Sequence, residues 1–506
     1  MSEKLINNVN EIMENEAQDD ERSRGLPGMT MTLTLFLVMA IFFVQLLRLK
    51  ILPLVLLVAV GSALLILLIT VGLLARDSSR RGRCIFAILL TLVLASGCLF
   101  GTVAGARILN TAREIIQPKI TQPITMAVYV RADDPARSLN DIRDYELGVM
   151  KIVDRPQSDE ALTQIEQNLG TTLTLKEYSS PVRLITALLE KETDAILIST
   201  DLLSIAKSLT GFSADLVRIL DRYELQIVVE DTTAEPTQPL PEIRPDNQHF
   251  TASPGVYTIY ISGIDDRSGL VSRSLSDVNI IAVVNTNTHR AALISTPRDY
   301  YVVTPVSGGE KDKLTHAGLY GVNVSRETLE NLYDMELDYI FRVDFSGFIR
   351  IIDAIGGVDV NVDQTFSSSG YTYTEGMMHM DGDMALIYAR ERKAFTAGDR
   401  VRGVHQMQLI EAVATKVFSS ELLTRYNSLL EALKGCFETT VPYDILAETV
   451  QRQLTGRSDW ELITYSVTGS DDYADTFSYP GNNYVMHPDW ETVEKAKQLM
   501  WEINRN

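Results

Sequence analysis

Residues 255–299 read GVYTIYISGIDDRSGLVSRSLSDVNIIAVVNTNTHRAALISTPRD and contain three β-like runs. The first run ends at Gly263, the second begins at Asp277 and the third ends at Arg298. The turn-forming NTNT between the second and third runs predicts an antiparallel hairpin. If the first run also pairs antiparallel with the second, then Asp265, Asp277 and Arg298 meet at one edge of the sheet.

A second stretch, LIYARERKAFTAGDRVRGVHQ, gathers five basic residues within thirteen positions of a chain whose formal net charge is −20. We expect a strand over MALIYARER, which places Arg390 and Arg392 on one face. We expect a long amphipathic helix after it, with Asp399 as its N-cap. Arg402 and Gln406 are four residues apart and therefore share a face of that helix.

These residue types have a chemistry in common. Arginine presents a planar fork of donors that matches phosphate oxygens, and Mg²⁺ takes one or two carboxylates together with substrate phosphates. The pattern therefore favours a pyrophosphate site with a divalent cation. A second interpretation stays open, because an RERK run is also typical of a solvated strand face, and Asp277 and Arg298 are ordinary turn residues.

Three apolar runs in the first part of the chain are each long enough to cross a bilayer, and together they form a membrane region over residues 29–108. The runs are residues 29–47, 51–75 and 84–108. The loop RDSSRRGR between the second and third runs is rich in arginine, which places it in the cytoplasm. The polar leader, residues 1–28, is then cytoplasmic too, and everything after Leu109 lies outside.

The outer part of the chain divides in two. Residues 124–230 alternate short β-like and helical stretches, which predicts a small accessory α/β domain. Residues 231–250 are rich in proline, threonine and acidic residues and form a linker. Residues 251–506 form the main domain, whose strands and helices also alternate.

Composition and motifs exclude several functions. The acidic net charge and the lack of a basic stripe disfavour nucleic-acid binding. Neither a GxSxG elbow nor a Walker P-loop occurs. Cys436 is the one cysteine outside the membrane region, so no intramolecular disulfide staples the outer part.

Eight blocks occur in an order and spacing that resemble the LytR–CpsA–Psr family, over roughly residues 256–416. The blocks are GIDDR, SDVNIIAVVN, ISTPRDYYV, KLTHA, DFSGF, IDAIGGVDV, MDGDMALIYARER and GDRVRGVHQ. The resemblance implies an α/β sandwich (αβα) with a mixed sheet and an apolar tunnel for a lipid tail. The three spans and the extra domain are most similar to the CpsA-type, capsule-assembly branch.

What the resemblance implies is an extracytoplasmic phosphotransferase in a Gram-positive type membrane. Its substrate would be a glycopolymer, expected to be capsular polysaccharide, carried on polyprenyl pyrophosphate. Its acceptor would be peptidoglycan, and capsule polymerisation or export proteins are expected partners.

The resemblance also assigns roles residue by residue. The implied ligands of Mg²⁺, or of Mn²⁺ in its place, are Asp265 and Asp277. The implied pyrophosphate-binding residues are Arg298, Arg390, Arg392, Arg402 and Gln406. The residues implied to act in catalysis are Arg298, Arg390, Arg392 and Asp399.

The chain departs from the family pattern at one position. The family usually has arginine two residues before the second metal aspartate, where this chain has Leu275, and the nearest arginine is Arg273. Leu275 and the added α/β domain keep one alternative open, a non-catalytic sensor or regulator of capsule assembly. A second alternative is a lipid pyrophosphatase, which differs from the transferase only in using water as its acceptor.

Overall fold

The computed structural model describes most of the chain. The described residues are 29–76, 81–116, 121–228, 249–264, 273–395, 398–417, 435–455 and 460–505. The leader 1–28, nearly all of the linker 231–250, and Asp265 lie outside them. The chain divides into two compact units, one formed by Met1–Glu114 and Pro442–Ser458, the other by Ile115–Val441 and Asp459–Asn506.

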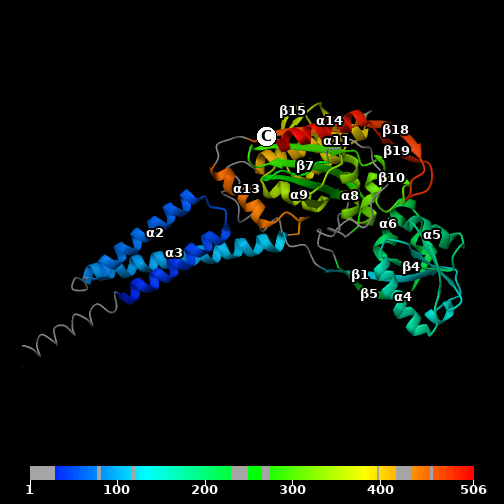
Figure 1. The fold of residues 1–506 in the computed structure, drawn as a ribbon, viewed down its shortest axis with the longest axis horizontal. Coiled ribbons are helices and arrows are strands. Elements are labelled where there is room, and N and C mark those ends of the chain that lie inside the picture. Colours follow the sequence, from blue (N-terminus) through cyan, green and yellow to red (C-terminus); the bar gives the residue numbers. More distant parts are fainter. Residues whose placement is uncertain are drawn as a thin grey trace, which may run out of the picture. The chain divides into compact units, whose positions relative to one another are not determined.

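The first unit is built on three apolar helices (Figure 1). They are Met29–Leu49, α2 (Leu54–Arg76) and α3 (Arg81–Ile116). Their most apolar windows have mean hydropathies of 2.2, 3.0 and 2.5, so each is long and apolar enough to cross a membrane. They pack through Leu35, Met39 and Val71, as expected for a small helical anchor.

Helix α13 (Tyr443–Thr455) belongs to the same unit. It contacts the turn between the first two apolar helices at three points. Lys50 Nζ lies 2.6 Å from Asp444 Oδ2, the Tyr443 hydroxyl donates to the carbonyl of Leu49 at 2.8 Å, and Gln451 donates to that of Leu52 at 2.8 Å. A distant segment of the chain therefore binds this turn.

The accessory domain is a five-stranded sheet in the order β3-β2-β4-β1-β5, covered on both faces by helices (Figure 1). Its elements are β1 (Thr121–Arg131), η1 (Leu139–Ile142), β2 (Glu146–Met150), α4 (Arg155–Leu169), β3 (Thr174–Tyr178), α5 (Pro181–Leu189), β4 (Ala195–Ser199), α6 (Thr200–Thr210), η2 (Ala214–Leu216) and β5 (Val217–Val228). Alternation along β1 sends Met126 and Val128 toward α4, and Ala127 and Tyr129 toward α5 and α6.

The main domain centres on a six-stranded mixed sheet in the order β16-β11-β6-β7-β8-β17. The strands of this sheet are β6 (Val256–Ile264), β7 (Ser276–Asn285), β8 (Arg290–Thr296), β11 (Tyr339–Asp344), β16 (Phe437–Thr439) and β17 (Glu461–Ser466). The short strands are β9 (Tyr301–Val303), β10 (Lys311–Lys313), β12 (Val358–Val362), β13 (Phe366–Ser368), β14 (Tyr371–Tyr373), β15 (Gly376–Met380), β18 (Gly469–Ala474) and β19 (Asn483–Pro488). The helices are α7 (Leu314–Ala317), η3 (Gly318–Tyr320), α8 (Val322–Tyr333), α9 (Phe345–Ala354), α10 (Gly382–Arg390), α11 (Gly398–Val417) and α14 (Trp490–Arg505).

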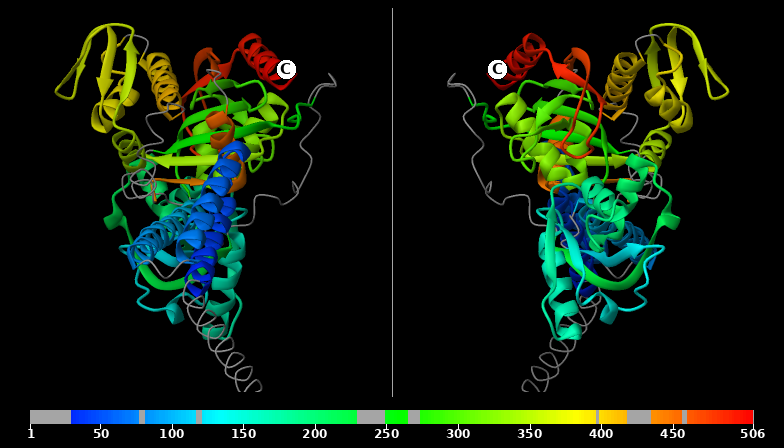
Figure 2. Two further views of the ribbon diagram at one scale, coloured as in Figure 1. Left: turned by 90° about the vertical axis from the view of Figure 1, so that its left-hand side faces the viewer. Right: turned by 90° about the vertical axis from the view of Figure 1, so that its right-hand side faces the viewer.

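Helices cover both faces of the six-stranded sheet. Along β7, Ile281 points to the layer that contains α8 and α14, whereas Ile280 points to Met407 of α11. In Figure 2, α11 stands between the six-stranded sheet and the β12–β15 strands. The α/β sandwich expected from the sequence is confirmed.

The segment MALIYARER is a helix, α10, and the expected strand is wrong. Asp381 caps the helix by accepting a hydrogen bond from the Met384 backbone at 2.9 Å, and the following residues are strong helix formers. The period-two argument that placed Arg390 and Arg392 on one strand face therefore fails. Arg390 ends the helix, and Arg392 lies in the turn that follows.

Helix α11 is present, but Asp399 is not its N-cap. The helix begins at Gly398, which leaves Asp399 inside its first turn. Arg402 and Gln406 both lie within the helix, one turn apart as expected.

Candidate functional site

Strand register explains why charged residues gather at one edge of the main sheet. Strands β6 and β7 pair antiparallel up to Ile264 opposite Ser276, and β7 and β8 pair with Asn279 opposite Thr296. Asp277, just before Asn279, and Arg298, just after Thr296, therefore meet at this edge. The convergence of these two residues, expected from the hairpin alone, is present.

Arg298 lies between two carboxylates. Its Nη1 forms an ion pair with Asp277 Oδ1, and its Nε lies 3.5 Å from Asp299 Oδ2. Lys313 holds the other oxygen of Asp299 at 3.1 Å. All four side chains are largely sheltered from solvent, which makes their charge interactions stronger than at an open surface.

Arg390 reaches the same place from the end of α10. Its guanidinium lies 4.4 Å from the ring centre of Phe345, the first residue of α9, in cation–π geometry. Stacking on the ring fixes the orientation of the planar guanidinium fork.

Glu391 shapes the turn that carries Arg392. It accepts backbone hydrogen bonds from Lys393 at 2.6 Å and from Ala394 at 2.9 Å, and Ser368 donates to its other oxygen. Burial acts to raise the pKa of Glu391, but these hydrogen bonds outweigh it and hold its pKa below the usual value. Glu391 is therefore ionised at neutral pH and fixes the turn.

Helix α11 supplies Arg402 and Gln406. Gln406 donates to the carbonyl of Ala389 at 3.3 Å, which ties α11 to the end of α10. One residue earlier, His405 stacks on Tyr388 with ring centroids 3.9 Å apart. Burial lowers the pKa of His405, although its hydrogen bond to the Tyr388 carbonyl acts in the opposite direction.

These side chains stand at a cavity of about 340 Å³, within the size range of small-ligand pockets. Its walls are mostly apolar. The apolar lining residues are Ile261, Val278, Phe341, Val343, Phe345, Phe348, Ile351, Leu386, Leu409, Ile410 and Val413. The charged and amide-bearing lining residues are Asp277, Arg298, Asp344, Arg390, Arg392, Arg402 and Gln406. The cavity thus combines an apolar part with a group of arginine side chains and a glutamine.

Six of the eight residues singled out from the sequence line this one cavity: Asp277, Arg298, Arg390, Arg392, Arg402 and Gln406. Asp265 lies outside the described residues, and the side chain of Asp399 is not among those described. Their binding and catalytic roles stay predictions.

Sequence reasoning missed Asp344. It ends β11, which runs parallel to β6 and places Asp344 opposite Ile264. Its Oδ1 accepts the Gly347 backbone N–H as the N-cap of α9, and its Oδ2 accepts no hydrogen bond from the described part of the chain. The sequence could have revealed Asp344, because it lies at the end of the predicted strand LDYIFRVDF, and the carboxyl ends of adjacent parallel strands meet at one edge of a sheet.

The residues present fit a magnesium ion in part. Mg²⁺ keeps several waters and binds through one or two carboxylates plus phosphate oxygens. Asp277 offers one such carboxylate beside the arginines. No group of three or more His, Cys, Asp or Glu side chains suited to a metal occurs among the described residues, and Asp265, the other predicted ligand, lies outside them.

A family model described as the LytR_cpsA_psr family matches residues 225–497, more than half of the chain. The chain belongs to the LytR–CpsA–Psr family. The resemblance inferred from the eight sequence blocks is thereby confirmed.

Curated relatives of this LytR–CpsA–Psr protein include two named polyisoprenyl-teichoic acid–peptidoglycan teichoic acid transferase TagU. The one from Enterococcus faecalis is 33% identical over 190 residues, 37% of this chain and 62% of the relative. The one from Oceanobacillus iheyensis is 35% identical over 218 residues, 42% of this chain and 66% of the relative. The chain therefore spans less than two thirds of the length of either relative.

Among solved structures, the crystal structure of B. subtilis TagV is similar over 49% of this chain and 96% of its own, at 28% identity and a TM-score of 0.43.

Proposed function

We propose that this protein is an extracytoplasmic phosphotransferase that moves a glycopolymer from polyprenyl pyrophosphate to peptidoglycan. The observation that carries the proposal is the cavity in which an apolar channel meets Arg298, Arg390, Arg392 and Arg402. A lipid pyrophosphate has the same two parts, an apolar tail and a compact, highly charged head. The names of the TagU relatives support this reaction class.

In the proposed reaction a peptidoglycan hydroxyl attacks the phosphorus that carries the polymer. The bond from this phosphorus to the bridging oxygen breaks, a phosphodiester forms, and polyprenyl phosphate departs with the proton or releases it to solvent. Arg298 and Arg390 would neutralise charge on the phosphate oxygens, which is the main task in phosphoryl transfer. For Asp399 we propose that it orients the acceptor hydroxyl.

Mg²⁺, or Mn²⁺, belongs to the proposal as the group that would neutralise pyrophosphate charge beside Asp277 and, by family resemblance, Asp265. The protein's own contribution is independent of that ion. Arg298 is held by Asp299, Arg390 is stacked on Phe345, and the turn of Arg392 is fixed by Glu391. Donors fixed in advance need no reorganisation when the charge shifts.

We propose capsular polysaccharide as the polymer, and we place the enzyme in the cell membrane with its N-terminus in the cytoplasm. The relatives are named for teichoic acid, so the test below compares the two polymers. Anchoring by three apolar helices would keep the active site close to its lipid-linked substrate and raise the effective concentration of that substrate.

The test uses the full-length chain in lipid nanodiscs. The substrates are polyprenyl-pyrophosphate-linked capsular oligosaccharide and, separately, lipid-linked teichoic acid, each with and without peptidoglycan. We expect the wild-type protein to transfer polymer to peptidoglycan, and we expect Arg392→Ala to lower the transfer rate by at least about 100-fold. Phosphate release without any need for peptidoglycan would support the pyrophosphatase instead.

The regulator interpretation rests on Leu275 together with the accessory domain, and it makes a different prediction. The regulator predicts that the full-length protein turns over neither polymer. It also predicts that the capsule phenotype survives Arg392→Ala but is lost when the accessory domain is disrupted. These two results together would favour the regulator over the transferase.

A further inference from the structure

Leu275 lies in the contact between the accessory domain and the main domain. One apolar cluster joins α5 and α6 of the accessory domain to main-domain residues. The main-domain members are Leu275, Val306, Leu319, Tyr320, Val324, Phe477 and Tyr479. The position where the family usually has a phosphate-binding arginine is therefore used here to hold another domain.

An ion pair crosses the same contact. Asp154, between β2 and α4, is 4% exposed, has a positive φ of 53°, and faces Arg273 Nη1. Neither of its carboxylate oxygens accepts a hydrogen bond from the described part of the chain. A charge buried this deeply depends on its partner, because removing one member leaves the other charge unpaired and unhydrated. Arg273 is four residues ahead of Asp277.

The chain between Arg273 and Asp277 rests on the segment 311–320. Ser274 donates its N–H to the carbonyl of Gly318 at 3.3 Å, and a Cβ on Gly318 would lie 2.2 Å from the Ser274 carbonyl oxygen. Glycine is therefore required at position 318 for this close approach. The same segment also holds Arg298, since the Thr315 N–H donates to the Arg298 carbonyl at 2.8 Å.

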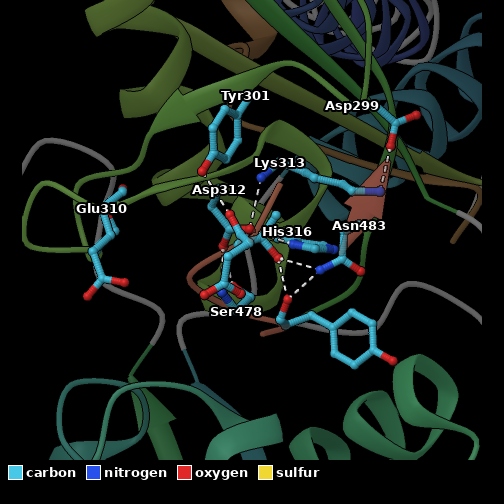
Figure 3. A network of polar contacts seen from close by, with 12 residues as sticks. Asp299, Tyr301, Glu310, Asp312, Lys313, His316, Ser478 and Asn483 are labelled. Atoms are coloured by element: carbon cyan, nitrogen blue, oxygen red, sulfur yellow. Dashed lines mark hydrogen bonds and ion pairs between the residues drawn. The ribbon is translucent and has the colours of Figure 1, made fainter. Parts of the chain in front are cut away.

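A network of polar contacts connects the 311–320 segment to its neighbours (Figure 3). The fully buried Asp312 lies 2.6 Å from His316 Nδ1 and accepts hydrogen bonds from the N–H and hydroxyl of Ser478. Lys313 extends to Asp299, the carboxylate beside Arg298, as the dashed line in Figure 3 shows. The Tyr320 hydroxyl lies 2.8 Å from that of Ser478, and its ring belongs to the apolar cluster of the domain contact.

We propose that the accessory domain is a positioning part of the pyrophosphate site. Asp154 and Arg273 form a positioning pair that, with Leu275 as an apolar anchor, fixes the start of β7 and thereby the Asp277–Arg298 geometry. This inference rests on the proposed function and adds residues outside the cavity to it.

The experiment measures binding of inorganic pyrophosphate with Mg²⁺ by calorimetry, using the full-length chain, alongside polymer transfer. We expect Asp154→Asn and Arg273→Gln each to weaken pyrophosphate binding by about tenfold or more, as loss of a supporting partner typically does. The charge-reversed double variant, Asp154→Arg with Arg273→Asp, should recover part of the loss. Binding is read without turnover, so a failure of transfer alone does not affect the result.

A matched control comes from the same domain contact. Arg183 and Glu310 form a more exposed ion pair, 3.9 Å apart, between the two domains. Glu310→Gln should leave pyrophosphate binding unchanged. Two results would show that the Asp154–Arg273 pair is only structural and that the proposal is wrong. In the first, Asp154→Asn and Glu310→Gln both bind pyrophosphate as wild type does. In the second, both variants lose pyrophosphate affinity equally and in proportion to the fall in their melting temperatures.

Should Asp154→Asn fail to fold, Arg273→Lys keeps the charge but loses the planar fork. It should lower pyrophosphate affinity with its melting temperature within a few degrees of wild type. Wild-type affinity in a folded Arg273→Lys variant would also overturn the proposal.

Discussion

At the mouth of the cavity, Arg298 contacts the carboxylates of both Asp277 and Asp299. The two contacts have different consequences. Asp277 lines the cavity and competes with any phosphate for the guanidinium. Asp299 is buried and held by Lys313, so it keeps Arg298 oriented whether or not a ligand is bound.

Replacing Arg298 by alanine should lower polymer transfer by at least about 100-fold, the usual effect of removing one fixed donor to a developing charge. The melting temperature should also fall, because Asp277 and Asp299 lose a sheltered partner, so transfer is compared at a temperature where the variants are folded. Arg290→Ala is the matched control. Arg290 lies at the other end of β8, paired with Glu461 at 2.9 Å, and its loss should leave transfer intact. Equal losses in both variants would argue against a site at Arg298.

Among the elements, α11 contributes to both parts of the cavity: Leu409, Ile410 and Val413 are apolar lining residues, and Arg402 and Gln406 are polar ones. Val413 lines the channel, whereas Val404 is exposed on the same helix. Val413→Trp should narrow the channel and raise the KM for a long-chain polyprenyl substrate by about tenfold, equivalent to the burial of about two methylene groups. The KM for a short-chain analogue should stay near wild type, and Val404→Trp should affect neither. Equal effects on both chain lengths would mean that the tail binds elsewhere.

His405 in α11 makes stability depend on pH. Its pKa in the folded protein is below the ordinary value of 6.5 because the ring is buried against Tyr388. The unfolded chain therefore binds more protons between these two values, and stability falls as the pH drops through about 6.5. Going from about pH 7.5 to about pH 5.5 should lower the melting temperature by a few degrees, and His405→Phe should remove part of that change.

An element is predictable from the sequence when the residues that determine it are close together in the chain. The β7–β8 hairpin was predictable because alternation and turn residues are local signals, and its register alone brought Asp277 to Arg298. Helix α10 was mistaken for a strand because its apolar residues suit either element, and its N-cap Asp381 was overlooked. The stacking of Arg390 on Phe345 could not be foreseen, since it depends on how α9 and α10 pack.

For the whole molecule, the sequence predicted two outer domains but not that Leu275 would lie in the contact between them. The packing of that residue against the accessory domain is a tertiary contact between segments that no local pattern connects. The same holds for Lys50 in the short turn between the first two apolar helices, since no local pattern connects this turn to α13. In the structure Lys50 pairs with Asp444 of α13, which gives the charge a structural reason.

The contact of α13 with the turn at Lys50 yields a topology prediction. Because α13 follows all three spans, the turn should lie on the outer side of the membrane and the start of α3 on the inner side. In a cysteine-free background, Lys50→Cys in intact cells should react with a membrane-impermeant thiol reagent. Gly82→Cys should react only after the cells are opened. The reverse pattern would invert the proposed orientation.

The ion pair between Arg298 and Asp277 has a further consequence for selectivity. A bare phosphate must separate the pair and leave a carboxylate uncompensated, whereas a phosphate that arrives with a divalent cation offers a new partner to each member. Under the proposed function, the pair would therefore disfavour monophosphates and free anions and favour a pyrophosphate that arrives with a divalent cation. After the proposed cleavage of the pyrophosphate, the two side chains would pair again, and their mutual attraction would help to release the product.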